Sequence, residues 1–307
     1  MHGSIVVLGS SNTDMIVKTP RIPRPGETIL GGTFATAAGG KGANQAVGAA
    51  RAGGRVTFVA RVGTDMFGDR AIEGFTTDGI DITHVVRDSA EPTGVALIIV
   101  DDSGENSIAV ASGCNACLSV DDVAAARDTI EHTSVLLMQL EVPLKTVEAA
   151  AETAAAAGVT VILNPAPAQV LPDSLFGHID ILTPNEHEAA MLTGIEVTDE
   201  LSAGTAARSL RDKGVETVLV TLGPRGVYVL SDGFTGLVPA FPVQAVDTTA
   251  AGDVFNGVFA CALAEGRPLV DAIEFACAAA AVSVTRLGAQ PSAPMRWEIE
   301  TFMMECN

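Results

Sequence analysis

Basic residues are scarce in this sequence. Its 307 residues include 18 lysines and arginines against 37 aspartates and glutamates, which gives a formal net charge of −19 at pH 7. A nucleic-acid-binding protein neutralises phosphates with clustered lysine and arginine side chains. The acidic balance therefore argues against such a protein. It does not exclude a polyanionic substrate, because one phosphate site needs only local donors.

The sequence also lacks long hydrophobic runs. Its richest apolar stretch, Ala276 to Val284, is bounded by Glu274 and Arg286. This is far short of the about 20 residues that a membrane-spanning helix requires. The N-terminus has no basic segment before its first apolar run, and Asp14 follows soon after. We therefore expect neither a membrane span nor a signal peptide.

Cysteines are few, and their number, five, is odd. This count in a large chain predicts reduced thiols in a cytoplasmic protein. Cys114 and Cys117 have C-x-x-C spacing, but no second pair completes a zinc site and no βαβ context indicates a redox centre. We expect two incidental thiols.

Apolar content is high, with 48% hydrophobic and 18% charged residues, which excludes general disorder. At about 150 residues per domain, the length allows two domains, and one large α/β domain with an accessory element fits equally well. Compact apolar runs predict buried strands at Ile5–Leu8, Thr57–Ala60, Val135–Met138, Val159–Leu163 and Ile179–Thr183. Alanine-rich segments between them predict helices at Gly42–Ala52, Val123–Glu131, Lys145–Ala157 and Thr205–Lys213.

Strands that alternate with helices predict an α/β fold with a doubly wound, mainly parallel sheet. Gly158 and Gly214 stand where two of the helices should end. In such sheets, ligands bind beyond the carboxyl ends of the strands. Polar residues that directly follow the predicted strands are therefore the first candidates for a functional site.

Two regions break the alternation, Met15–Phe34 and Thr93–Val110. Both contain extended segments joined by turns, and neither is followed by a crossover helix. We interpret them as a small β-sheet that stands off the main body and could close over a pocket to exclude water. An ordinary edge hairpin is the alternative.

The strongest local signal is Asp247-Thr248-Thr249-Ala250-Ala251-Gly252-Asp253, followed by an apolar run. Small residues lead into a predicted helix, so free backbone N–H groups at Ala250–Asp253 could bind a phosphate there. Asp253 could accept a proton from an attacking hydroxyl group. The alternative is that Asp253 only favours the helix N-terminus electrostatically.

A second signal is Gly39-Gly40-Lys41-Gly42-Ala43-Asn44-Gln45. It lacks the Ser or Thr that follows the lysine of a phosphate-binding P-loop, so we reject that motif. Glycines before a helix still allow a polar ligand to approach closely, and Asn44 and Gln45 could present amides to hydroxyl groups. A glycine-rich strand-to-helix turn is the alternative.

Asn12 and Asp14 follow the first predicted strand at a spacing of two, which puts both side chains on one face of an extended segment. Paired acceptors at this place suit the hydroxyl groups of a sugar. The alternative on this segment alone is an Asx turn.

Asn185 and Glu188 follow another predicted strand and are neighbours on a helix face. Their amide and carboxylate could hold a hydrated Mg²⁺ with its phosphates, or they could form a capping box with Asn185 as the N-cap. The segment from Thr221 to Gly226 is a strand end followed by a tight turn. It could line a nucleotide pocket or make a hairpin.

These motifs, in this order, resemble the ribokinase family of carbohydrate kinases. The match runs from Val6-Val7-Leu8-Gly9-Ser10 to Gly288-Ala289-Gln290-Pro291-Ser292, nearly the whole chain. The segments that carry the resemblance are Gly39–Gln45 and Asp247–Asp253, which match the two family signatures, together with Met138-Gln139-Leu140-Glu141 and Asn164-Pro165-Ala166-Pro167.

The resemblance implies one Rossmann-like carbohydrate kinase domain over residues 1–307. Its β-sheet lid, at about 15–34 and 93–110, would double as the interface of a homodimer. The implied reaction transfers the γ-phosphoryl group of ATP to the 5-hydroxyl of D-ribose, with Mg²⁺ and an activating K⁺. Phosphoryl transfer of this kind depends on positioning and charge stabilisation more than on covalent chemistry.

The resemblance also implies roles for individual residues. Asp253 would be the base, beside an anion hole of N–H groups from Ala250, Ala251 and Gly252. The sugar would be held by Asn12, Asp14, Gly40, Lys41, Asn44 and Glu141, together with Asp253. The nucleotide would be bordered by Asn185, Thr221, Gly223, Arg225, Gly226, Gly252 and Cys277. Mg²⁺ would be organised by Asn185 and Glu188, and K⁺ by Asp247, Thr249, Ser283, Arg286, Gly288 and Ser292, mostly through carbonyl oxygens.

Two positions depart from the family pattern. Cys277 stands near the implied adenine site, where the family often carries His or Asn, and Pro224 has no backbone N–H to offer the nucleotide. Both bear on nucleotide affinity and on the choice between ATP and GTP. Neither touches the implied chemistry.

Two other functions stay open from the sequence. The first is a kinase for another small sugar, such as 2-deoxyribose or fructose. The second is a non-catalytic sugar-binding protein on the same fold. The presence of Lys41, Gly252 and Asp253 argues for an enzyme, because a pure binder need not keep a base beside an anion hole.

Overall fold

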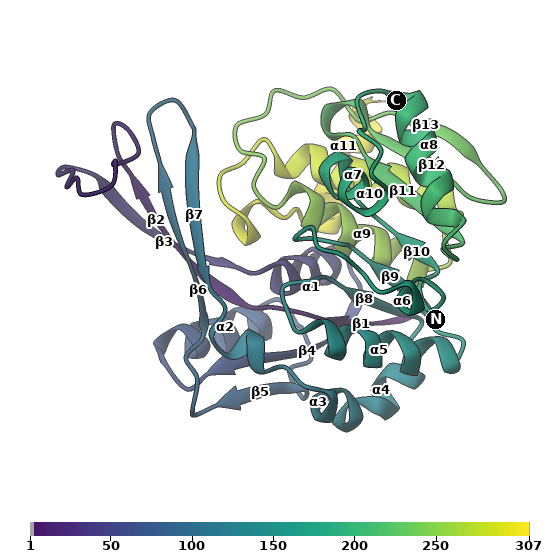
Figure 1. Cartoon of the computed structure of the whole chain (residues 1–307), viewed down its shortest axis with the longest axis horizontal. Helices are drawn as coiled ribbons and strands as arrows, with labels where there is room; N and C mark the ends of the chain where they lie inside the picture. Colours follow the sequence, from purple (N-terminus) through teal and green to yellow (C-terminus); the bar gives the residue numbers. More distant parts are fainter. Residues whose placement is uncertain (1–2, 307) are drawn as a thin grey trace.

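The computed structural model describes residues 3–306 and contains a nine-stranded central sheet (Figure 1). The strand order is β13-β12-β11-β10-β9-β8-β1-β4-β5. Neighbouring strands from β5 to β11 run parallel, and β12 is antiparallel to both of its neighbours. The predicted mainly parallel sheet is therefore confirmed. Its strands are β1 Ser4–Leu8, β4 Arg55–Gly63, β5 Val85–Asp88, β8 Val135–Met138, β9 Thr160–Leu163, β10 Ile181–Leu182, β11 Thr217–Thr221, β12 Val227–Leu230 and β13 Thr235–Val238.

Helices cover both faces of this sheet. Successive side chains of a strand point to opposite faces, so Ile5 and Val7 of β1 lie in one hydrophobic cluster and Val6 and Leu8 in the other. The first cluster contains side chains of α1 Lys41–Arg51, α2 Met66–Thr77, α9 Ala251–Ala264, α10 Leu269–Ser283 and α11 Arg296–Cys306. The second contains side chains of α3 Val120–Ala125, α4 Arg127–Glu131, α5 Leu144–Ala156, α6 Asp173–Phe176, α7 Glu186–Thr193 and α8 Glu200–Arg211.

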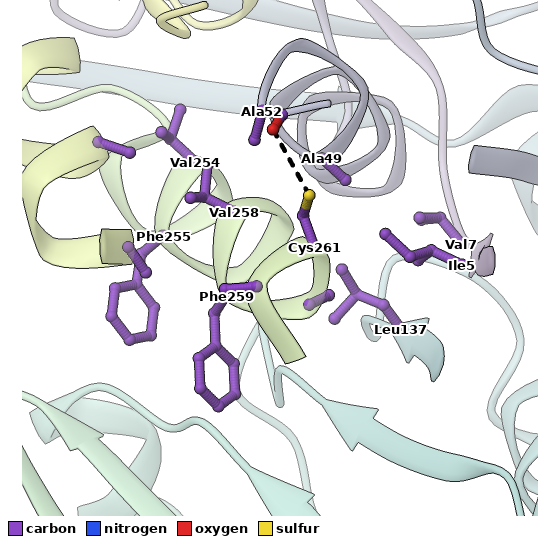
Figure 2. Packing of buried hydrophobic residues seen from close by; sticks show 14 of the residues in the cluster. Ile5, Val7, Ala49, Ala52, Leu137, Val254, Phe255, Val258, Phe259 and Cys261 are labelled. Carbon is purple, nitrogen blue, oxygen red and sulfur yellow. Dashed lines mark hydrogen bonds between the residues drawn. The ribbon is translucent and has the colours of Figure 1, made fainter. Parts of the chain in front are cut away.

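Figure 2 shows how tightly α9 is packed into the first cluster. The rings of Phe255 and Phe259 stack with their centroids 5.9 Å apart. On another side of the helix, the thiol of Cys261 donates to the carbonyl of Ala52 across 3.7 Å. A helix fixed on several sides gives its N-terminal turn a defined position relative to the sheet.

One predicted helix is wrong in its extent. The segment Val123–Glu131 is not one helix, because α3 and α4 are separated at Ala126, whose φ and ψ are −93° and 4°. A capping box of Ser119 and Asp122 starts α3 before the predicted start. Likewise, α8 begins at Glu200 because Asp199 caps it, and the strand predicted at Ile179–Thr183 shrinks to two residues. Gly158, with φ 73°, follows the end of α5 as expected.

A four-stranded sheet stands apart from the central sheet, at the left of Figure 1. Its order is β3-β2-β6-β7, with β2 and β6 parallel and the outer pairs antiparallel. The predicted small sheet is confirmed, and the alternative of an edge hairpin is wrong. Its strands are β2 Asn12–Lys18, β3 Thr33–Gly39, β6 Gly94–Val100 and β7 Asn106–Ala111.

The order of the central strands reverses beside β1. The chain places β4 and β5 on one side of β1, and β8 to β11 on the other. Ligands of open α/β sheets bind at the carboxyl ends of the strands at such a point. The segments that follow β1 and β8 therefore face the expected ligand position.

No helix among residues 3–306 is long and apolar enough to cross a membrane.

Candidate active site

Three segments meet at the carboxylate of Glu141, which follows β8. Its Oε2 accepts hydrogen bonds from the hydroxyl of Ser10 at 2.6 Å and from the backbone N–H of Lys41 at 3.0 Å. Lys41 begins α1 after Gly40, whose φ is 89°. A Cβ at Gly40 would lie 2.6 Å from the backbone nitrogen of Asn12, so only glycine allows this close approach.

The carboxylate of Asp253 lies in the first turn of α9 and is only 6% exposed. Its Oδ2 accepts from the amide of Asn44 at 2.9 Å, and its Oδ1 accepts from the amide of Gln45 at 3.0 Å. Both oxygens thus bind α1, which goes beyond the alternative of an acid that merely favours its own helix. Burial raises the pKa of Asp253, while the ammonium of Lys41 and the two amides act to lower it.

Asp253 belongs to a cluster of interacting charges. The carboxylates of Asp14, Glu141 and Glu188 interact electrostatically with it, and the ammonium of Lys41 interacts with Asp253, Glu141 and Glu188. Burial and the negative charges of Glu141 and Asp253 raise the pKa of Asp14 to about 6. The carboxylate of Asp253, opposed by burial, raises the pKa of Lys41. We call these five side chains the carboxylate cluster.

Asn44 and Gln45 differ from the prediction and from each other. Gln45 was expected to present its amide to a ligand, and this is wrong, because the side chain is fully buried and bonds to Asp253, Asn164 and Gln139. Asn44 donates to Asp253, but its buried Oδ1 accepts nothing from the residues that the structure describes. An acceptor in this state is suited to a ligand hydroxyl.

Asn12 is held by a residue that the sequence did not indicate. Its Oδ1 accepts from the amide of Asn115 at 2.7 Å, so the protein already occupies part of the acceptor predicted at Asn12. Asn115 also donates to the carbonyl of Ser11 and accepts from its N–H, at 3.1 and 2.9 Å. Asn115 lies between Cys114 and Cys117, a segment that we assigned no role.

The turn before α9 has an unusual backbone. Ala250 caps the helix with φ 59°, the left-handed region that residues other than glycine seldom occupy. A left-handed residue beside a helical one makes a concave row of N–H groups that suits an anion. Of the three expected donors, the N–H of Ala251 already donates to the carbonyl of Thr248 at 3.2 Å. The α-carbon of Gly252 faces open space.

Asn185 and Glu188 do form a capping box at the start of α7. Asn185 Oδ1 accepts from the Glu188 N–H at 2.8 Å, and Glu188 Oε2 accepts from the Asn185 N–H at 2.9 Å. The structural alternative is therefore present. Glu188 is nevertheless a member of the carboxylate cluster, and burial raises its pKa.

The segment from Thr221 to Gly226 ends β11 and turns into β12. Thr221 forms a parallel bridge with Asn185, which brings this segment beside the start of α7. Arg225 forms an ion pair with Glu186 and donates to the carbonyl of Thr198 at 2.7 Å. Gly223 and Gly226 both have positive φ, at 56° and 110°, as a tight turn requires. These contacts hold the turn beside the start of α7.

Of the residues predicted to bind K⁺, Asp247, Thr249 and Gly288 are joined by hydrogen bonds. Asp247 accepts from the N–H and hydroxyl of Thr249 at 2.9 and 2.6 Å, and from the N–H of Gly288 at 2.8 Å. Burial acts to raise the pKa of Asp247, but these hydrogen bonds outweigh it and hold the pKa below its usual value. The hydroxyls of Ser283 and Ser292 donate to carbonyls of Ala280 and Ala289, and Arg286 forms an ion pair with Glu298.

Other candidate groups are simpler. Cys277 is buried in α10, where burial raises the pKa of its thiol to about 12. Cys114 and Cys117 are free thiols, as expected. Within residues 3–306, no group of three or more His, Cys, Asp or Glu side chains is placed to hold a metal ion.

The site has the parts of a sugar kinase, and sequence comparison assigns the family. Residues 2–296 match the pfkB family of carbohydrate kinases. The chain belongs to this family. It is 50% identical over 303 residues to the ribokinase of Haemophilus influenzae, with 99% of each chain covered. The resemblance inferred from the motifs is confirmed.

Solved structures of the family share the fold. The ribokinase of Thermotoga maritima is 41% identical, with a TM-score of 0.90 and coverage of 98% of this chain and 99% of that one. The Arabidopsis thaliana ribokinase, solved with ribose and ATP, is 36% identical, with a TM-score of 0.90 and 99% of both chains covered. The pairing of a large sheet with a small separate one is thus a property of this kinase fold.

Proposed function

We propose that this chain transfers the γ-phosphoryl group of ATP to the 5-hydroxyl of D-ribose, giving ribose 5-phosphate and ADP. The observation that carries the proposal is the carboxylate of Asp253, buried at the N-terminus of α9 and held by two amides of α1. This carboxylate lies beside the backbone N–H groups of the turn before α9 and belongs to the carboxylate cluster. The identity of the sugar follows from the ribokinases of the same family.

The carboxylate cluster and its neighbours supply the contacts for ribose. Hydroxyl groups of a sugar donate to Asp14 and Glu141 and to the unpartnered Oδ1 of Asn44. Lys41 and the amide group of Asn12 donate to sugar oxygens. Gly40 lets the chain pack against the backbone at Asn12, which brings the start of α1 beside the sugar contacts of β2.

Asp253 acts as the base. It accepts the proton of the 5-hydroxyl as the oxygen bonds to the γ-phosphorus, and the bond from that phosphorus to the β-phosphate oxygen breaks. The N–H groups of Ala250 and Gly252, together with that of Ala251, which also donates to the carbonyl of Thr248, stabilise the charge on the transferring group. The amides of Asn44 and Gln45 orient the carboxylate so that a remaining acceptor lobe of Asp253 faces the sugar.

Cations fit the charge of this site. The carboxylates of Asp14, Glu141, Glu188 and Asp253 would repel a nucleotide polyphosphate unless a cation accompanies it. Glu188, with Asn185, would hold hydrated Mg²⁺, which neutralises phosphate charge when bound. K⁺ would lie at Asp247, Thr249 and the Ser283–Ser292 loop, where carbonyl oxygens suit a large cation.

The nucleotide would lie along the segment from Thr221 to Gly226, with Gly252 at its phosphates and Cys277 near its base. The four-stranded sheet acts as the lid of a single kinase domain and as the contact between two copies in a homodimer. Its cross-strand row of Ala35, Ile16, Ile98 and Ile108 is apolar, and Ile108 is exposed. The protein works in the cytoplasm, where ATP and reduced thiols are found.

ADP release coupled to a spectrophotometric signal, measured over a panel of sugars, tests the proposal. We expect the highest kcat/KM with D-ribose, and lower values with 2-deoxyribose and fructose. Higher kcat/KM with one of the other sugars would identify a different sugar kinase. Sugar binding by calorimetry without any ADP release would identify a non-catalytic sugar-binding protein.

Potassium dependence tests the second cation site. Asp247 accepts a hydrogen bond from the N–H of Gly288, which holds the Ser283–Ser292 loop beside the turn that leads to α9. K⁺ bound at this place should therefore order the anion hole. We expect turnover to rise when K⁺ replaces a large organic cation at equal ionic strength. Equal rates in the two salts would remove K⁺ from the account.

A further inference from the structure

Behind Asp253 lies a group of buried polar side chains of which the proposed reaction uses only Gln45. Gln45 donates from one nitrogen to both Asp253 and Asn164, at 3.0 and 3.1 Å. Gln45 is fully buried and Asn164 nearly so. Polar groups this deep in a protein are costly unless each has a partner. Their arrangement therefore calls for a role.

The orientation of Gln45 is fixed from one side. The amide of Gln139, also fully buried, donates to Gln45 Oε1 at 2.6 Å. Because that oxygen is the acceptor for Gln139, only the nitrogen of Gln45 can face Asp253. Gln139 leaves its own Oε1 buried without a partner among the described residues.

A second set of contacts leads from Asn164 back to α9. Asn164 donates to the carbonyl of Thr183 at 3.0 Å, and the hydroxyl of Thr183 donates to Asn256 Oδ1 at 2.6 Å. Asn256 then donates to the carbonyl of Gly252 at 2.8 Å. Thr183 and Asn256 are each 1% exposed. The contacts form a closed path from the carboxylate of Asp253 to the peptide that follows Gly252.

We propose that Gln45, Asn164, Thr183 and Asn256 form a positioning chain, which holds the base and the anion hole in fixed relative geometry. The chain starts at Asp253 Oδ1 and ends at the carbonyl of Gly252. None of its members except Gln45 touches Asp253, and none is a catalytic residue. The inference rests on the proposed function, since it assigns Asp253 as the base and the turn of Gly252 as the anion hole.

The geometry explains why such a path is useful. The base and the anion-hole donors must meet the two ends of one forming oxygen–phosphorus bond, and a misplacement of about 1 Å can cost about 100-fold in rate. Ala250 places the turn in a left-handed conformation that its surroundings must enforce. A hydrogen bond to the carbonyl of Gly252 restrains the first peptide of α9 from the core side.

Thr183 offers the sharpest test, because Thr183→Val removes only the hydroxyl and Thr183→Ser keeps it. We expect Thr183→Val to lower kcat at least about tenfold while ribose affinity by calorimetry stays unchanged. Thr183→Ser should restore most of the rate. Thr146→Val is the matched control, since Thr146 also buries a hydroxyl bond, to the carbonyl of Leu118 at 2.7 Å in another part of the core.

Thermal unfolding of the three variants separates positioning from stability. If Thr183→Val and Thr146→Val lose similar stability but only the first loses kcat, the positioning chain is supported. If kcat of Thr183→Val equals that of wild type, or if Thr183→Ser fails to restore it, the chain is overturned.

Gln45→Met tests the other end of the path and covers the case in which Thr183→Val does not fold. The charged groups that face Asp253 are Lys41 of α1, Glu141 after β8, Glu188 of α7 and Asp14 of β2. All remain in the variant. Because the Gln45 amide favours the charged form of Asp253, its loss should move the acidic limb of the kcat/KM profile to higher pH, by about one unit.

A carboxyl ¹³C NMR titration of Asp253 in wild type and Gln45→Met gives a readout that needs no turnover. An upward shift of the Asp253 titration in Gln45→Met supports the chain, and an unchanged titration overturns it. Wild-type turnover with ribose is measured separately. A wild type without sugar-dependent ADP release would reject the proposed function, while the titration would still report on the contact between Gln45 and Asp253.

Discussion

The two sheets of this protein differ in how much of each is buried. The nine-stranded sheet is buried between helices, and in β1 and β8 almost every side chain belongs to one of the two hydrophobic clusters. In the four-stranded sheet, all of β7 and most of β3 are exposed, and β2 carries the charged side chain of Asp14. The first sheet positions the ends of its strands. In the proposed function, the second sheet presents residues to a ligand and to another copy of the chain.

This difference teaches where stability and function reside. Buried parallel strands gain their stability from packing on both faces. A sheet with open faces gains less stability from packing. A carboxylate on such a sheet keeps part of its contact with water, so it costs less stability there than in a fully buried strand. Three substitutions test the contrast, in order of their expected effect on the free energy of unfolding.

Phe58→Ala in β4 should have the largest effect. Phe58 is fully buried and contacts Phe75 edge to face, with ring centroids 5.2 Å apart. Removing a buried phenyl ring leaves a cavity, so we expect a loss of about 3–5 kcal/mol in denaturant unfolding. Leu97→Ala, at a position of β6 that is 54% exposed, is the control and should change stability little. Equal losses at both positions would break the contrast between the sheets.

Asp14→Asn should stabilise the protein, and only at higher pH. The pKa of Asp14 is raised to about 6 in the folded chain, so the folded state loses stability as pH rises through that value. At pH 8 the variant should be more stable by about 1–2 kcal/mol, a figure reduced for the partial exposure of the side chain. At pH 3 the two proteins should unfold alike, because Asp14 is then protonated in both states. Greater stability of the wild type at pH 8 would contradict this account.

Asp14→Asn should also weaken ribose binding, measured by calorimetry at pH 8. In the proposed function the carboxylate accepts sugar hydroxyls, and the amide that replaces it accepts less strongly. A gain in stability paired with a loss of affinity would show that the small sheet trades one for the other.

Ile108→Asp in β7 should have the smallest effect on the unfolding of a subunit. Ile108 pairs with Ile98, on the same face of the sheet as Asp14, and is 55% exposed. If that face joins two copies, a charge there should convert a dimer into a monomer in sedimentation velocity, with stability changed by no more than about 0.5 kcal/mol. A variant that sediments like the wild type would place the contact between subunits elsewhere.

Much of the central sheet could be predicted from local sequence. Val135–Met138 was predicted with its observed bounds, because a strand buried on both faces is a continuous apolar run. The break between α3 and α4 at Ala126 could not be predicted, since the sequence there is favourable to helix on both sides. Strands β5 and β13 were missed as well, and β12 was anticipated only through the alternative of a hairpin at Thr221–Gly226. Tertiary contacts decided these features.

The candidate site also has features that local sequence predicts and features that it does not. The positions of Asp253 and Asn185 follow from local signals, namely small residues before a helix and a capping box. The partners of these residues do not. Gln45 and Asp253 are separated by 208 positions, and Asn12 and Asn115 by 103. Nothing in the neighbourhood of Gln45 or Asn115 indicates which distant side chain it meets.

The central claim is that the carboxylate of Asp253 is the base of the transfer, and Asp253→Asn tests it most directly. With ribose and ATP saturating, we expect kcat to fall by about 10²- to 10⁴-fold. The variant should still fold and bind ribose, because the new amide keeps the shape of the side chain, although its NH2 group replaces an oxygen that accepts from Asn44 or Gln45. A variant that folds, binds ribose and turns over at a near-normal rate would contradict the account.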